Sequence, residues 1–136
     1  MYNKILVAMA LDHDVSPQTT QIARVLCASG GEIFALHVYE APQGSVGAYL
    51  DEKTVNESFE RARATLHSKL EGIDGIDGEI IKGHSARTII DYATDNGFDC
   101  IVLGSHKPGL SDYFLGSTAS RVVRHAACAV HVHRSS

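Results

Sequence analysis

Five short apolar runs, separated by stretches with helical periodicity, constrain the fold of this chain more than any other feature. The runs lie at residues 4–10, 32–40, 78–83, 99–105 and 128–134. The first, KILVAMA, is apolar at almost every position, which is typical of a strand that is buried on both faces. Strands that are joined through helices form right-handed parallel crossovers. The sequence therefore predicts the α/β class, with a doubly wound, mostly parallel sheet of five strands and four helices.

Four helices are expected where apolar residues recur every three or four positions. The first should begin at the Ser-Pro pair of residues 16–17 and end at the Ser-Gly-Gly of residues 29–31. Its apolar face should consist of Ile22, Val25 and Leu26. The other three are expected between residues 55 and 70, at 85–97 with Ser85 as the N-cap, and at 117–127.

The composition is that of one folded domain, which we expect to span residues 1–136. With 44% hydrophobic and 21% charged residues, the chain is neither disordered nor membrane-spanning in character. A net charge of -4 disfavours nucleic acid as a partner. The chain starts directly with a strand-like run, and its three cysteines lack CxxC spacing. We therefore expect a cytoplasmic protein with free thiols that binds neither membranes nor nucleic acid.

One segment has the features of a phosphate-binding loop. Residues 104–120, GSHKPGLSDYFLGSTAS, follow the fourth apolar run and lead into the last helix. The backbone N–H groups of residues 116–118 would point out of the start of that helix, where the helix dipole favours an anion. His106 and Lys107 could add positive charge. The alternative is that Ser117 only caps the helix, and the residues of the loop leave both interpretations open.

Four segments carry a resemblance to a known family: KILVAMALDHDVS, EIFALHVYE, DCIVLGSHKPGLSDYFLGSTASRVVRHA and CAVHVHR. With them the chain resembles the universal stress protein family from end to end. Nucleotide-binding members of that family carry glycine, two residues, glycine, nine residues, glycine, and then serine or threonine. Gly104 and residues 116–118 match the two ends of this pattern, whereas Lys107 replaces the second glycine and the span is one residue shorter. Residues 8–10, Ala-Met-Ala, stand where relatives often have Pro-Val-Asp.

The resemblance implies a Rossmann-like fold and a cytoplasmic stress-response protein that binds ATP or AMP, with or without Mg²⁺. It also implies a homodimeric sensor or regulator that acts on a protein partner. In this interpretation the backbone of Val38 contacts the adenine, Leu103 and Gly104 lie beside the ribose and phosphates, and Asp12 replaces the missing aspartate if its loop folds back. The expected nucleotide-binding residues are Ala8, Asp12, Val38, Leu103, Gly104, His106, Lys107, Gly109, Gly116, Ser117 and Thr118.

The last strand is expected to form the dimer interface, through Val130, His131, Val132 and His133. Members of the family commonly pair this strand with its copy across a two-fold axis. An unpaired edge strand is prone to association, and two-fold pairing covers it. The alternating spacing places both histidines on one face of the strand, which we interpret as a polar face rather than a metal site.

Three other functions are open at this level. A family member that has lost its nucleotide would act through protein contacts alone, and Ala10 and Lys107 favour this alternative. A slow ATP hydrolase would have only Asp12 and His106 to activate water, so no catalytic residue is assigned. A flavodoxin-like cofactor binder fits the fold class, but the loop after the first strand lacks a cradle rich in serine and threonine.

Overall fold

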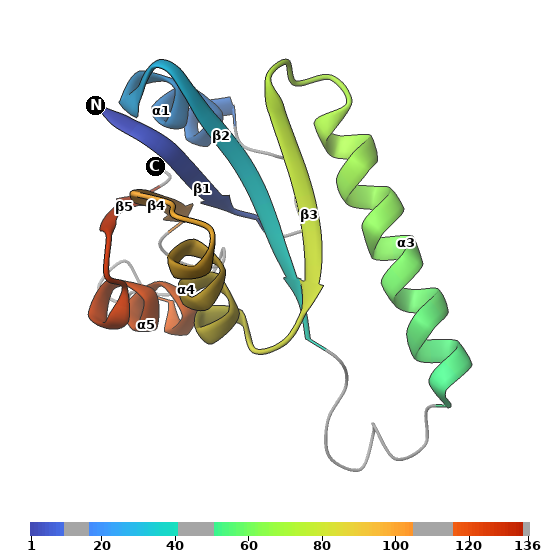
Figure 1. Cartoon of the computed structure of the whole chain (residues 1–136). Coiled ribbons are helices and arrows are strands. Elements are labelled where there is room, and N and C mark those ends of the chain that lie inside the picture. The colour runs from blue at the N-terminus through green and yellow to red at the C-terminus, as the bar shows by residue number, and fades with distance from the viewer. Residues whose placement is uncertain (10–16, 41–50, 105–115, 135–136) are drawn as a thin grey trace.

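A computed structural model describes residues 1–9, 17–40, 51–104 and 116–134 (Figure 1). In chain order the elements are β1 (Tyr2–Ala8), α1 (Pro17–Leu26), β2 (Cys27–Tyr39), α3 (Glu52–Leu70), β3 (Ile76–Lys82), α4 (Ser85–Asp95), β4 (Cys100–Gly104), α5 (Ser117–His125) and β5 (Ala129–His133). The strands form one five-stranded sheet in the order β3-β2-β1-β4-β5, and every pairing is parallel. The predicted fold class is confirmed.

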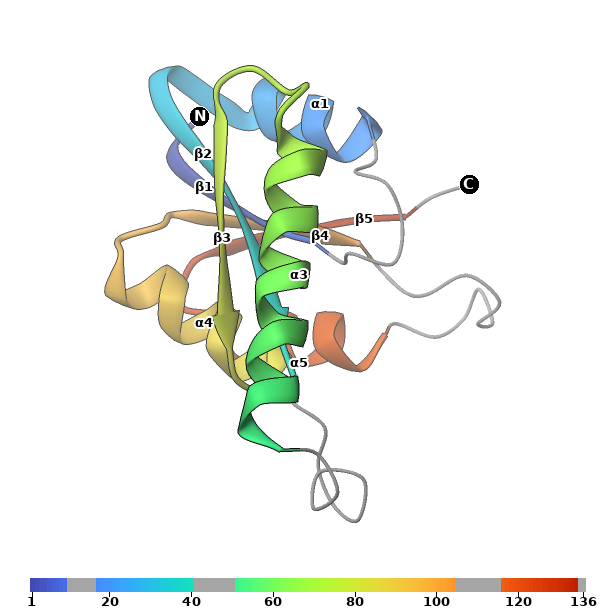
Figure 2. The same cartoon turned by 90° about the vertical axis from the view of Figure 1, so that its right-hand side faces the viewer.

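The sheet is the middle layer of three (Figures 1 and 2). Consecutive residues of β1 show why its sequence is apolar throughout, because Ile5 and Val7 pack with Ala23 of α1 while Leu6 packs with α4 and α5. On the α1 side, Leu66 of α3 is fully buried against the neighbouring strands. Both faces of the central strands are therefore covered by helices, as parallel sheets require.

The Ser-Gly-Gly of residues 29–31 lies inside β2 and does not terminate the first helix, which ends at Leu26. Tyr2 pairs with Cys27 and Lys4 with Glu32, so β1 advances by two residues where β2 advances by five. The excess forms a bulge, in which Gly30 has a φ of 80° that favours glycine. The prediction that β2 starts at residue 32 was wrong because the bulge makes the strand longer than its apolar run.

The predicted apolar face of α1 is wrong at one position. Val25 is 75% exposed, whereas Ala23 is fully buried. Ile22 and Leu26 are half-buried, and both lie within about 100° of Ala23 around the helix axis. At about 100° per residue, Val25 lies about 200° around the helix from Ala23 and therefore faces solvent.

The strand order places the point at which the crossovers reverse beside β1. The chain proceeds from β1 to β2 and β3 on one side, and then returns to place β4 and β5 on the other. Val7 and Val102 are the last register pair of β1 and β4. Ala8 and Gly104 therefore end these two strands on the same side of the sheet, where the carboxyl ends of the parallel strands lie. In doubly wound folds this side is where ligands bind.

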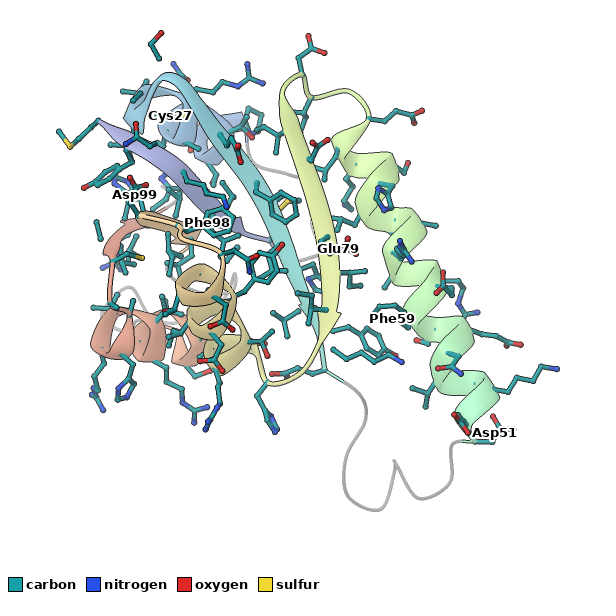
Figure 3. All side chains as sticks on the ribbon, viewed as in Figure 1. Cys27, Asp51, Phe59, Glu79, Phe98 and Asp99 are labelled. Carbon is teal, nitrogen blue, oxygen red and sulfur yellow. The ribbon has the colours of Figure 1, made fainter. Side chains whose placement is uncertain are left out.

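On the opposite side of the sheet, Asp99 joins the start of β4 to the start of β1 (Figure 3). Its carboxylate accepts hydrogen bonds from the backbone N–H groups of Asn3, at 2.9 Å, and Lys4, at 3.0 Å. Burial raises the pKa of the Asp99 carboxyl. The hydrogen bonds from the N–H groups of Asn3 and Lys4 and the positive charge of the N-terminus lower this pKa by more than burial raises it, so the pKa lies below its usual value.

We expect Asp99→Asn to lower the stability at pH 7 by about 1 kcal/mol, because the charge strengthens both hydrogen bonds. The carboxylate contributes stability above the pKa of the unfolded state, and this contribution is lost as the pH falls through the lower pKa of the folded state. Urea unfolding at several pH values between 7 and 2 should therefore give a flatter acid limb for Asp99→Asn than for the wild type. Parallel curves would contradict this role; Asp77→Asn, at an exposed position, is the control.

Candidate functional site

The candidate site lies where β1 and β4 end and α5 begins. These ends all face the right-hand side of the view in Figure 2. Ala8 is half-buried at the end of β1, and Gly104 is exposed at the end of β4. A Cβ atom added at Gly104 would meet no atom of the described residues within 4 Å, and the backbone of Gly104 is outside the left-handed region. Within the described part of the chain, the end of β4 is therefore not covered by a neighbouring atom at the position of a Cβ.

The N-cap residue of α5 has no side chain that could cap the helix. Gly116 is its N-cap, with φ −60° and ψ 154°, and makes no side-chain capping bond. The first helical hydrogen bond joins the N–H of Ser120 to the carbonyl of Gly116 at 2.8 Å. The N–H groups of residues 117–119 therefore precede the helical bonding pattern, and their partial charge is positive. This end of α5 is suited to bind an anion.

The start of α4 is different, because the chain supplies an anion of its own. Oε1 of Glu40, which follows β2, accepts hydrogen bonds from both the backbone N–H and the hydroxyl of Ser85, each at 2.8 Å. The N-cap is His84, so the prediction that Ser85 caps this helix was wrong. Ser85 is instead the first residue of α4 and donates to a carboxylate that lies 45 positions earlier in the chain.

Two of the expected adenine and ribose contacts have buried side chains. Val38 is 9% exposed and Leu103 is 3% exposed, and both belong to the core beneath α4 and α5. Only their backbone atoms are suited to contact a ligand. Asp12, His106, Lys107 and Gly109 lie outside the described residues.

His37 is a site residue that the sequence analysis missed. Its Nδ1 lies 2.8 Å from the carbonyl oxygen of Met9, and the N–H of Met9 donates to the carbonyl of Leu36 at 2.9 Å. Since a carbonyl only accepts, Nδ1 carries the proton and donates. These bonds hold the residue after β1 against β2. The available signal was a polar residue inside an otherwise apolar strand.

A cavity of about 730 Å³ lies between α4 and α5. From α5 it is lined by Ser117, Thr118, Arg121 and His125, and from α4 and its N-cap by Arg87 and His84, among other residues. Side chains with nitrogen at their tips project together from this part of the molecule (Figure 3). Arg121 is exposed, and no pattern in the sequence indicates that a cavity lies beside it.

The cysteines do not form a reactive centre. All three are free thiols, as predicted, and Cys100 is buried while Cys27 and Cys128 are half-buried. Burial raises the pKa of Cys100 to about 11 and also raises that of Cys128. These two thiols are therefore protonated at neutral pH and are poor nucleophiles.

The expected interface strand, β5, is at the edge of the sheet. Val130 and Val132 pack against the core beneath α4 and α5, and the alternation of the strand puts His131 and His133 on the opposite face. The Nε2 atom of His133 is buried and has no hydrogen-bond partner among the residues that the structure describes. Among the described residues, no group of three or more histidine, cysteine or acidic side chains could hold a metal ion. Nor is any described helix both long and apolar enough for a membrane span.

The model of the universal stress protein family matches residues 1–134. The chain belongs to the universal stress protein family. Universal stress protein G of Salmonella typhimurium is 30% identical over 145 residues, which cover 98% of this chain and 100% of that protein. The alignment therefore extends over the full length of a curated family member.

Solved structures of universal stress proteins share the fold. UspA from Lactobacillus plantarum has a TM-score of 0.68, with 24% identity and 98% of each chain covered. A universal stress protein in complex with cAMP has a TM-score of 0.61, with 22% identity and coverage of 99% of this chain and 98% of that chain. A family protein from Arabidopsis thaliana with AMP bound has a TM-score of 0.60, with 18% identity and coverage of 98% and 92%.

The Glu40 contact leads to a prediction for this universal stress protein. Glu40→Ala removes the acceptor of two hydrogen bonds at the start of α4 and should lower the free energy of unfolding by about 1–2 kcal/mol. Glu40→Gln keeps an acceptor oxygen and should recover part of the loss. Thermal and urea unfolding would measure both, with Glu60→Ala on the exposed side of α3 as the control. Equal stability of the two alanine variants would contradict the capping role.

Proposed function

We propose that this universal stress protein binds an adenine nucleotide, ATP or AMP, at the ends of β1 and β4, with the phosphates on the first turn of α5. The observation that carries the proposal is the contrast between two helix starts. Glu40 neutralises the start of α4, whereas no described side chain caps the start of α5. An anionic group of a ligand would provide the negative charge and the hydrogen-bond acceptor at the start of α5 that Glu40 provides at the start of α4.

The residues of the proposed site would contact different parts of the nucleotide. Gly104 lies beside the ribose and phosphates, because a Cβ added there meets no atom of the described residues within 4 Å, and Ala8 borders the site at the end of β1. The backbone of Val38 and Leu103 contacts the nucleoside, since their side chains are buried. The hydroxyls of Ser117 and Thr118 and the backbone N–H groups beside them hold a phosphate. From the sequence, Asp12, His106, Lys107, Gly109 and Gly116 complete the proposed site.

The structural relatives support the choice of an adenine nucleotide. One was solved with cAMP and another with AMP bound, and both share the fold over nearly the whole chain. A phosphate at a helix start and a nucleoside at the strand ends are also the usual arrangement in doubly wound folds. We extend the proposal to a cytoplasmic homodimer that changes, on nucleotide binding, what it presents to a protein partner.

Ser117→Asp separates binding from stability. A carboxylate in the first turn of α5 favours the helix dipole, so stability without ligand should stay equal or rise by up to about 1 kcal/mol. The same charge repels a phosphate, so nucleotide binding should be lost. The wild type should melt at a higher temperature with millimolar ATP or AMP, since a ligand at about 100 times its Kd adds about 2.7 kcal/mol.

Thermal melting and isothermal titration with ATP and AMP provide the readout. Ala64→Asp, which adds the same charge at an exposed position of α3, should keep the nucleotide-dependent shift. Gly104→Val should still fold, because a Cβ added at this position meets no atom of the described residues within 4 Å, and it should also lose binding. No shift in the wild type with either nucleotide would overturn the proposed function.

The dimer is proposed to form by pairing of two β5 edges across a two-fold axis, through Val130, His131, Val132 and His133. Because two-fold pairing brings like residues close together, His131→Glu should place two negative charges near the axis and shift the equilibrium towards monomer. Sedimentation equilibrium would measure this, with Val25→Glu on the exposed face of α1 as the control. A wild type that is monomeric at all concentrations would rule the dimer out.

A further inference from the structure

The proposed phosphate seat opens into the cavity between α4 and α5. Ser117 and Thr118 form the first turn of α5 and also line this cavity. Its volume, about 730 Å³, lies within the range of about 300–1,000 Å³ that is typical of small-molecule sites. A chain of phosphates bound at the first turn can therefore extend into a space that the protein already provides.

Arg121 lies next to this seat within the cavity. It follows Ser117 by four residues and Thr118 by three, so the three side chains share one side of α5. Helical side chains lean towards the N-terminus, which directs the guanidinium of Arg121 towards the first turn. Arg121 is exposed, and no ion pair or hydrogen bond of its side chain occurs within the described residues.

The acidic groups that line the cavity have other partners. Asp91 forms an ion pair with Arg87 at 3.7 Å on α4. Glu40 accepts the two hydrogen bonds from Ser85. His84 and His125 are the remaining titratable groups on the lining among the described residues. The side of the cavity that belongs to α5 is therefore cationic, and its arginine is available to an anion.

We propose that the cavity between α4 and α5 distinguishes nucleotides by their number of phosphates, with Arg121 as the residue that binds the terminal phosphates. The inference rests on the proposed function, because it requires the first phosphate to bind at the start of α5. AMP ends at that seat, whereas the second and third phosphates of ATP reach Arg121. Arginine binds phosphate through two parallel N–H groups, and such charged contacts are the stronger hydrogen bonds in proteins.

The test is isothermal titration of ATP and AMP into four proteins: wild type, Arg121→Ala, Arg121→Lys and Arg124→Ala. The wild type should bind ATP at least about tenfold more tightly than AMP, as one charged contact contributes. Arg121→Ala should weaken ATP by about tenfold and leave AMP within about twofold. Arg121→Lys, which keeps the charge but not the paired N–H groups, should restore part of the difference. Arg124 is on α5 but does not line the cavity, so Arg124→Ala should resemble the wild type.

The outcomes separate this inference from the proposed function. Equal binding of ATP and AMP by the wild type, or an equal loss of both in Arg121→Ala, would overturn the role of Arg121 and leave the nucleotide site in place. Binding of neither nucleotide by the wild type would overturn both. Arg121 is an exposed side chain, and circular dichroism would verify that its variants are folded.

Discussion

The parallel pairing of β1 with β4 is the constraint on which the rest of the structure depends. These strands meet where the crossovers reverse direction, so their ends border the space that a ligand can enter. Asp99 fixes their amino ends through the N–H groups of Asn3 and Lys4. At the other edge, His37 holds the carbonyl of Met9 and so positions the segment that leaves β1. Residues that are not among the proposed ligand-binding residues therefore position the ends of β1 and β4.

The two helices that cover one face of this sheet, α4 and α5, differ in the groups that surround their N-termini. The start of α4 faces the carboxylate of Glu40 at 2.8 Å, while the start of α5 has a glycine N-cap and two hydroxyl residues after it. Because the dipoles of the two helices are alike, the difference comes only from the side chains around them. Because the carboxylate of Glu40 lies at the start of α4, the start of α5 is the one that is available to the anion of a ligand. The cavity then joins the two helix starts and adds cationic side chains from both helices.

The elements could be predicted from the sequence because each has a local signal. The continuous apolar run of β1 and the regular apolar spacing of α3 each lie within a short stretch of sequence. The errors concern features that depend on distant residues. The bulge in β2 depends on the backbone at Gly30, and its neighbour Gly31 would bring a Cβ within 2.9 Å of the carbonyl oxygen of Asn3. No local pattern records that contact.

For the candidate site, too, the sequence indicated the residues that are neighbours in the chain but not the contacts between distant residues. The glycine and hydroxyl residues at the start of α5 are adjacent in sequence, and the fold class places them at the ligand edge. The capping of α4 by Glu40 joins residues that are 45 positions apart, and no pattern in the sequence indicates it. The cavity beside Arg121 is a product of how α4 and α5 pack, so a single helix cannot reveal it.

Binding of a phosphate at the start of α5 is measured most directly by titrating ¹⁵N-labelled protein with AMP and following the chemical shifts of the backbone amides. If the phosphate binds at the start of α5, the largest changes should occur at Gly104 and residues 117–119, because the N–H groups of these residues would surround the phosphate. The amide of Ser85 should change little, since Glu40 already accepts its hydrogen bond. Nucleotide binding with changes centred on the start of α4, and none at the start of α5, would contradict a phosphate site at α5.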